Sequence, residues 1–182
     1  MDDSDSRDIQ ACLAGETDAY GRLVDRYESR IARLMWRFSR DPLQCEELVQ
    51  DVFVEAYMSL SGFRGEAPFV HWLKRIGTRV GYRFWKRQAK ERRSTPLGDL
   101  EPAETPEPTG PREAAEALAA LLARLKPADR LVLTLQYFEE CGIEEIARRM
   151  GWTKGMVKMR AHRARKKLRE IAGREKAFED LT

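Results

Sequence analysis

The sequence predicts an all-α protein made of two small helical domains joined by a proline-rich linker. Apolar residues recur three or four positions apart through most of the 182 residues, and no stretch alternates apolar and polar residues as a strand would. Five of the eight prolines fall within residues 94–112, where the apolar periodicity is lost. Apolar residues make up 42% of the chain, which is enough for small cores.

Composition narrows the class of protein further. No apolar run approaches the roughly 18 residues of a membrane span, and the acidic start of the chain does not resemble a signal peptide. The three cysteines, Cys12, Cys45 and Cys141, are scattered and odd in number, which argues against a disulfide framework. We therefore expect a cytoplasmic protein whose cysteines occupy core or loop positions, with a redox-sensing role as the alternative.

Two helices are predicted at the start of the first domain. The first has Thr17 as its N-cap and an apolar face of Tyr20, Leu23, Tyr27, Ile31, Leu34 and Phe38. The second begins with Asp41 as N-cap, Pro42 at the first helical position and Gln44 as the capping-box partner. Its apolar face comprises Cys45, Leu48, Val49, Val52, Phe53, Ala56, Tyr57 and Leu60.

A long helix follows a loop at residues 61–68 that contains two glycines and a proline. The helix should run from about residue 68 to 92 and bury Phe69, Leu73, Ile76, Val80 and Phe84. A second stripe, about 100° away around the helix, is basic: Arg75, Arg79, Arg83, Lys86 and Lys90. Trp72 and Tyr82 fall on or beside this basic stripe.

Four shorter patterns predict the helices of the second domain. The first helix contains Leu118, Leu121, Leu122 and Leu125 and ends before Pro127; the second contains Leu131, Val132, Leu135 and Phe138. The third follows Gly142, contains Ile143, Ile146, Ala147 and Met150, and ends at Gly151. Thr153 can cap the last helix, which should bury Val157, Ala161, Ala164, Leu168 and Ile171.

Charge is distributed in blocks that the net value of +3 conceals. Residues 71–93 hold nine Lys or Arg against one acid, and residues 148–169 hold ten against none. Residues 1–66 and 94–113 are acidic overall. Two basic blocks separated by an acidic one are typical of proteins that bind a polyanion; two solvated helix faces are the alternative.

The spacing of Ala147, Gly151 and Val157 predicts a helix-turn-helix. A small residue lets two helices cross closely, glycine makes the turn, and the apolar residue packs back. The predicted second helix presents an outward face suited to phosphates and base edges: Lys154, Lys158, Met159, His162, Arg163 and Lys166. Another kind of helical hairpin could satisfy the spacing alone.

Several segments, in order, resemble the extracytoplasmic-function sigma factors, the group 4 members of the sigma-70 family. Residues 143–151 (IEEIARRMG) and 154–169 (KGMVKMRAHRARKKLR) resemble region 4 of that family. Residues 46–53 (EELVQDVF) resemble a region 2 helix. Residues 63–69 (FRGEAPF), followed by Trp72-Leu73 and Arg75-Ile76, resemble the promoter-melting loop and helix. The resemblance covers about residues 5–173.

This resemblance implies a domain plan and a set of partners. Residues 5–93 would be a region 2 helical bundle, 94–112 an acidic linker near the RNA exit path, 113–173 a region 4 helix-turn-helix domain, and 174–182 a tail. The chain would bind core RNA polymerase, at the beta-prime clamp helices and the beta flap, and promoter DNA. An anti-sigma factor would be a further partner, and no cofactor, metal or catalytic residue would be needed.

The resemblance also assigns residues to three surfaces. The polymerase-docking residues would be Glu47, Gln50 and Asp51, although an ordinary solvated acidic face would look the same. Contacts to the melted minus-ten element would come from Phe63, Arg64, Phe69, Trp72, Arg75, Arg79, Tyr82, Arg83 and Lys86, although Phe69 and Trp72 could be core residues instead. Contacts to the minus-thirty-five element would come from Thr153, Lys154, Lys158, Met159, His162, Arg163 and Lys166.

Two positions depart from the family pattern, and three other classes of function compete with it. Arg79 stands where the family often has Asn, and Met159 where a small polar residue is common, so the promoter sequence stays open. A stand-alone helix-turn-helix regulator would explain the second domain but not the region 2 resemblance. The sequence has no phosphate-binding glycine motif, HExxH or CxxC that would indicate an enzyme. The third alternative takes the basic helices as elements that lie on a membrane surface, but their apolar faces are better explained as core.

Overall fold

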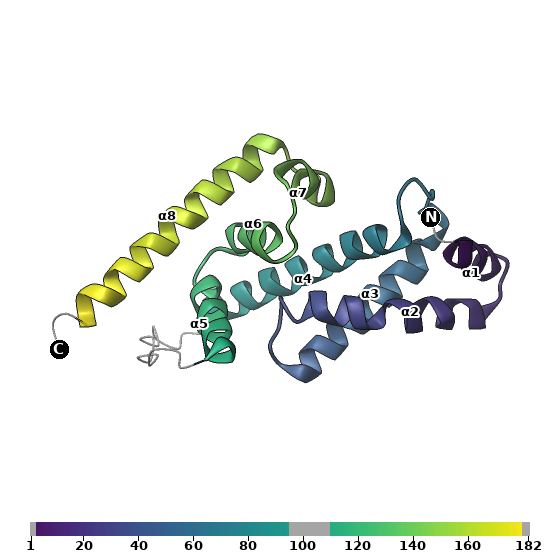
Figure 1. Cartoon of the computed structure of the whole chain (residues 1–182), viewed down its shortest axis with the longest axis horizontal. Helices are drawn as coiled ribbons and strands as arrows, with labels where there is room; N and C mark the ends of the chain where they lie inside the picture. Colours follow the sequence, from purple (N-terminus) through teal and green to yellow (C-terminus); the bar gives the residue numbers. More distant parts are fainter. Residues whose placement is uncertain (1–2, 95–109, 180–182) are drawn as a thin grey trace. The chain divides into compact units, whose positions relative to one another are not determined.

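All regular elements in the described residues, 3–94 and 110–179, are helices. The computed structural model contains α1 (Asp3–Leu13), α2 (Thr17–Met35), α3 (Pro42–Ser59), η1 (Leu60–Gly62), α4 (Phe69–Ser94), α5 (Pro111–Ala123), α6 (Pro127–Phe138), α7 (Ile143–Met150) and α8 (Lys154–Glu179) (Figure 1). The chain divides into two compact units, Met1–Trp85 and Lys86–Thr182. The all-α prediction is confirmed for these residues, whereas most of the predicted linker, residues 95–109, lies outside them.

Helix α1 is the one α-helix of the first unit that the sequence patterns did not predict. It packs along α2 (Figure 1), yet only Ile9 is a buried apolar residue in it. Its contact is made by the buried carboxylates of Asp5 and Asp8, which bond to side chains of α2. Apolar periodicity cannot reveal a helix that packs mainly through acidic residues.

Helix α2 has the predicted apolar face but different ends. Glu16, not Thr17, is its N-cap, and Thr17 is already the first helical residue. The helix ends at Met35, so Phe38 lies in the following turn, where it is nonetheless buried. The Phe38 ring centroid is 4.6 Å from that of Trp85, whose Nε1 donates a 2.7 Å hydrogen bond to the Phe38 carbonyl. This turn is therefore part of the core of the first unit.

The predicted start of α3 is confirmed, with one difference in its capping box. The Gln44 N–H donates to Asp41 Oδ1 at 2.9 Å, as expected of an N-cap. The return bond is indirect, because the Asp41 N–H donates to Ser39 Oγ at 3.2 Å and the Ser39 hydroxyl bonds Gln44 Oε1 at 3.1 Å. Tyr57, on the predicted apolar face of this helix, is 51% exposed.

Helix α4 packs closely against the end of α2 and the turn that follows it, and glycines make this possible. A Cβ atom at Gly81 would lie 2.3 Å from the Phe38 ring, and one at Gly77 would lie 3.0 Å from Leu34 Cδ2. Any larger residue at Gly81 would force the phenyl ring out of its place. The predicted buried face is confirmed: Phe69, Leu73, Ile76, Val80 and Phe84 are all buried.

The second unit contains α5 to α8, which pack around a small apolar core. That core includes Leu122, Leu125, Leu133 and Ala164, with Phe138 and Leu168 packed against it. Leu118, which belongs to the apolar pattern that predicted α5, is 40% exposed. Helix α8 continues to Glu179, so the predicted tail at 174–182 is helical over most of its length. Among the described residues, no helix is long and apolar enough to cross a membrane.

Candidate nucleic-acid interface

The turn between α7 and α8 has the geometry that the Ala147, Gly151 and Val157 spacing predicts. Gly151 adopts a left-handed conformation, with φ of 68°, and caps α7. The Trp152 N–H donates to the Ala147 carbonyl at 2.9 Å, which closes the turn. Ala147 and Val157 are both buried, so the two helices pack through them. This tight packing fixes the direction of α8 relative to α7, as a helix-turn-helix requires.

A second contact fixes the start of α8, and the sequence patterns did not single it out. The Arg160 guanidinium lies over the Trp152 ring, 3.7 Å from its centroid. Thr153 caps the helix as predicted, since its Oγ1 accepts a 3.2 Å hydrogen bond from the Met156 N–H. A stacked arginine and a capping hydroxyl thus hold the first turns of α8.

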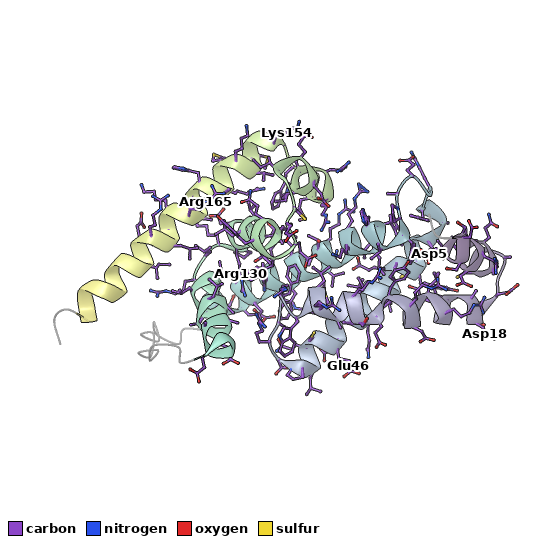
Figure 2. All side chains as sticks on the ribbon, viewed as in Figure 1. Asp5, Asp18, Glu46, Arg130, Lys154 and Arg165 are labelled. Carbon is purple, nitrogen blue, oxygen red and sulfur yellow. The ribbon has the colours of Figure 1, made fainter. Side chains whose placement is uncertain are left out.

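The outward face of α8 is basic and open to solvent. The residues predicted to meet the minus-thirty-five element are all exposed: Thr153, Lys154, Lys158, Met159, His162, Arg163 and Lys166. Lys154, at the start of α8 (Figure 2), bonds Glu144 of α7, and this hydrogen bond lowers the pKa of the Glu144 carboxyl. An exposed pair of this kind is weak and can open when a phosphate competes for the lysine.

Arg163 differs from the other members of this face because it has a structural partner. Its Nε and Nη2 donate to the two carboxylate oxygens of Asp129 in α6, at 2.7 and 2.6 Å. Asp129 is only 3% exposed, and the pair holds α8 against α6. Arg163 therefore positions α8 in this structure, and both nitrogens that form the fork are already engaged.

Three aromatic rings meet at the base of the loop that precedes α4. The ring centroids of Phe63, Phe69 and Trp72, called here the aromatic cluster, are 5.3–5.4 Å apart. Phe69 is 1% exposed, so it is a core residue and has no surface to offer DNA, contrary to its assignment from the sequence. Phe63 and Trp72 are half-buried and can stack on an unpaired base.

Basic residues continue from the aromatic cluster along α4. Arg64 in the loop is exposed and lies 3.8 Å from Glu66. Arg79, Arg83 and Lys86 are exposed, and Arg83 bonds Glu55 of α3. Two further residues assigned to this surface, Arg75 and Tyr82, are half-buried. A row of cations next to partly exposed rings is an arrangement suited to single-stranded nucleic acid.

The outer face of α3 forms a third exposed surface. Glu47, Gln50 and Asp51 all lie on it and are exposed, as predicted. Three apolar residues lie on the same stripe and were not singled out from the sequence: Leu43, Val54 and Met58, which are 73%, 57% and 79% exposed. Leu43 stands eleven residues before Val54, and Val54 four before Met58, which places all three on one side of a helix and could have revealed them. Exposed apolar side chains among acidic ones are an arrangement suited to a protein partner.

Together, the helix-turn-helix and the basic surfaces define a DNA-binding protein. The family described as Sigma-70 region 2 matches residues 23–91, and the one described as Sigma-70, region 4 matches residues 115–168. The chain belongs to the sigma-70 family of RNA polymerase sigma factors.

Similar curated proteins carry sigma-factor names. The RNA polymerase sigma-H factor of Pseudomonas aeruginosa is 29% identical over 175 residues, covering 90% of this chain and 91% of that protein. The ECF RNA polymerase sigma-E factor of Escherichia coli is 28% identical over 169 residues, covering 86% and 88%. The similarity therefore extends over nearly the full length of both relatives.

Two solved structures are also similar. The structure of CnrH in complex with the cytosolic domain of CnrY has a TM-score of 0.60 and 27% identity, and the match covers 94% of this chain and 98% of that one. The sigma factor RpoE in complex with the anti-sigma factor NepR from Bartonella quintana has a TM-score of 0.59, with 85% and 96% covered. At 19% identity, the second likeness concerns the fold alone.

Proposed function

We propose that this chain is an alternative sigma factor, a transcription initiation factor that binds core RNA polymerase and directs it to specific promoters. The observation that carries the proposal is the presence of region 2 and region 4 matches in one chain. A stand-alone helix-turn-helix regulator would account for the α7–α8 turn alone. It would not account for the region 2 match or for the aromatic cluster beside a basic helix.

In this function, α8 binds the minus-thirty-five element as duplex DNA. Its exposed N-terminal half enters the major groove, where Lys158, Met159 and His162 meet base edges. Thr153, Lys154 and Lys166 contact phosphates, which fixes the register of the helix on the duplex. Arg163 contributes by holding α8 in its orientation through Asp129.

The loop before α4 captures the melted minus-ten element. Phe63 and Trp72 offer partly exposed rings to a base that has left the duplex, and each stacked base contributes roughly 1–3 kcal/mol. The phosphates of the same strand run along the basic residues of this surface: Arg64, Arg75, Arg79, Arg83 and Lys86. Tyr82 lies among them and can stack or donate a hydrogen bond.

Polymerase docking is the role of the outer face of α3. Glu47, Gln50 and Asp51 face the beta-prime clamp helices, while the second unit engages the beta flap. Exposed apolar residues between the acids support a protein partner at this face. As a polymerase subunit in the cytoplasm, the chain needs no catalytic residue of its own. An anti-sigma factor that covers both units is the regulator we expect for a chain of this family.

Run-off transcription tests the proposal. The purified chain is mixed with core polymerase and a library of promoter fragments, and the transcripts are sequenced. A sigma factor should start transcription at a subset of promoters that share spaced minus-thirty-five and minus-ten motifs. Failure to bind core polymerase, together with tight sequence-specific binding of the free chain to duplex DNA, would favour the stand-alone regulator.

A further inference from the structure

A chain of contacts connects the N-terminal helix to the loop that precedes α4. Helix α1 packs against η1, the short helix from which the loop starts. Asp5 of α1 accepts a 2.6 Å hydrogen bond from the Tyr27 hydroxyl of α2. The Tyr27 ring lies against Phe69, with ring centroids 5.6 Å apart. Because Phe69 belongs to the aromatic cluster, α1 contacts the cluster through two buried side chains.

Asp5, where this series of contacts begins, belongs to a network of hydrogen bonds between α1 and α2. Asp5 is 2% exposed and also accepts a 2.7 Å hydrogen bond from Arg26 Nη1. Arg26 is fixed in turn by Asp8, at 2.6 Å, and Asp8 accepts a 2.8 Å bond from Arg22 (Figure 2 labels Asp5 on α1). Burial, and then the bond to Asp5, raise the pKa of Tyr27 to about 12, so its hydroxyl remains a donor at any physiological pH.

We propose that Asp5 and Tyr27 are positioning residues for promoter melting: they hold Phe69, and through it Phe63 and Trp72, where an unpaired base of the minus-ten element is captured. Phe69 is the buried member of the aromatic cluster, and the Tyr27 ring packs against it. Capture of a base requires rings that are already in place, since ordering them during melting would cost binding free energy. This inference rests on the proposed function and adds α1 to the melting machinery.

The test uses reconstituted holoenzyme and a duplex promoter that carries a fluorescent base analogue, 2-aminopurine, in the non-template strand of the minus-ten element. Tyr27→Phe removes only the hydroxyl that bonds Asp5 and keeps the ring against Phe69. We expect it to lower the equilibrium amount of open complex about two- to tenfold, the range for loss of one buried hydrogen bond. Asp5→Ala removes the same bond from its other end and also the bond from Arg26, so it should lower the amount of open complex at least as much.

Arg22→Gln is the matched control. It removes a bond between α1 and α2 but leaves Asp5, Tyr27 and Phe69 untouched. Holoenzyme assembly should be equal in all variants, and Arg22→Gln should open the promoter as the unmodified chain does. A loss with Arg22→Gln equal to that with Tyr27→Phe would mean that any loosening of α1 has this effect, and the proposed chain of contacts would be wrong.

A double-mutant cycle with Trp72→Ala separates this inference from the proposed function. If Tyr27 acts through the aromatic cluster, Tyr27→Phe should add nothing once Trp72 has been replaced. If the losses of open complex are additive, or if Trp72→Ala is defective in promoter opening while Tyr27→Phe is not, the inference is wrong and the proposed function stands. Normal opening by Trp72→Ala would overturn both the inference and the proposed melting role of the cluster.

Discussion

Replacement of Arg163 by alanine separates a base-reading role from a positioning role. Arg163 shares two hydrogen bonds of 2.6 and 2.7 Å with Asp129, which is 3% exposed. Removing the arginine leaves a buried carboxylate without its counter-ion, which costs about 3–5 kcal/mol when the pair is fully buried. Because the arginine side chain is itself half exposed, water can reach part of the site, and we reduce the expected loss to about 2–3 kcal/mol.

That loss should be measurable as thermal destabilisation of the second unit. For a domain of this size, 1 kcal/mol corresponds to about 4–8 °C, so Arg163→Ala should lower the melting temperature by roughly 10–20 °C. Asp129→Ala should cost less, about 1 kcal/mol, because the freed arginine can be solvated. Circular dichroism of the full chain measures the shift, and hydrogen exchange of α6 and α8 locates it.

Lys166→Ala is the control on the same helix, since Lys166 is exposed and should not affect stability. Promoter affinity of each holoenzyme is measured in parallel across minus-thirty-five variants. A positioning role predicts weaker binding to every variant with Arg163→Ala. Unchanged thermal stability together with lost preference at a single base pair would refute the reasoning and make Arg163 a base reader.

Four further predictions concern residues other than Arg163. Gln50→Ala with Asp51→Ala should weaken binding to core polymerase, measured by native gel titration, without lowering helix content; unaltered affinity would remove this face of α3 from the docking surface. Lys166→Ala should weaken all promoters about equally and reduce the salt dependence of binding by about one counter-ion, which a titration against salt concentration measures. Met159→Ser should change the preferred minus-thirty-five base, because an exposed thioether can contact a thymine methyl. Replacing each thymine in turn by deoxyuridine should weaken promoter binding of the unmodified chain at one position only. No response at any position would exclude this contact. The hydrogen bonds from Arg26 and Arg22 lower the pKa of Asp8, so its contribution to stability is complete above about pH 3.9, the ordinary aspartate value, and is lost as the pH falls through the lower folded value. In urea unfolding at pH 7 and pH 3, Asp8→Asn should therefore reduce the difference in unfolding free energy between the two pH values. An unchanged difference would contradict this role of Asp8.

Local signals in the sequence were sufficient for most of the helices. The stripe of α4, from Phe69 to Phe84, is buried as its spacing predicts, and Asp41 and Thr153 cap α3 and α8. The helix-turn-helix follows from three residues, and its small, glycine and apolar positions behave as expected. Such features depend on neighbours within one or two turns, and a sequence displays those neighbours directly.

Contacts between distant segments needed the tertiary structure. Helix α1 packs through buried carboxylates, so its place became evident only when Asp5 and Asp8 were found opposite the arginines and the tyrosine of α2. The bond between Arg163 and Asp129 joins residues 34 positions apart and gives a structural partner to a residue that the sequence assigned to DNA alone. Composition and periodicity determined which residues form helices and which faces are basic. The partners of each charged side chain were decided only by the fold, because a charge on a solvated face and a charge in a buried ion pair have the same sequence pattern.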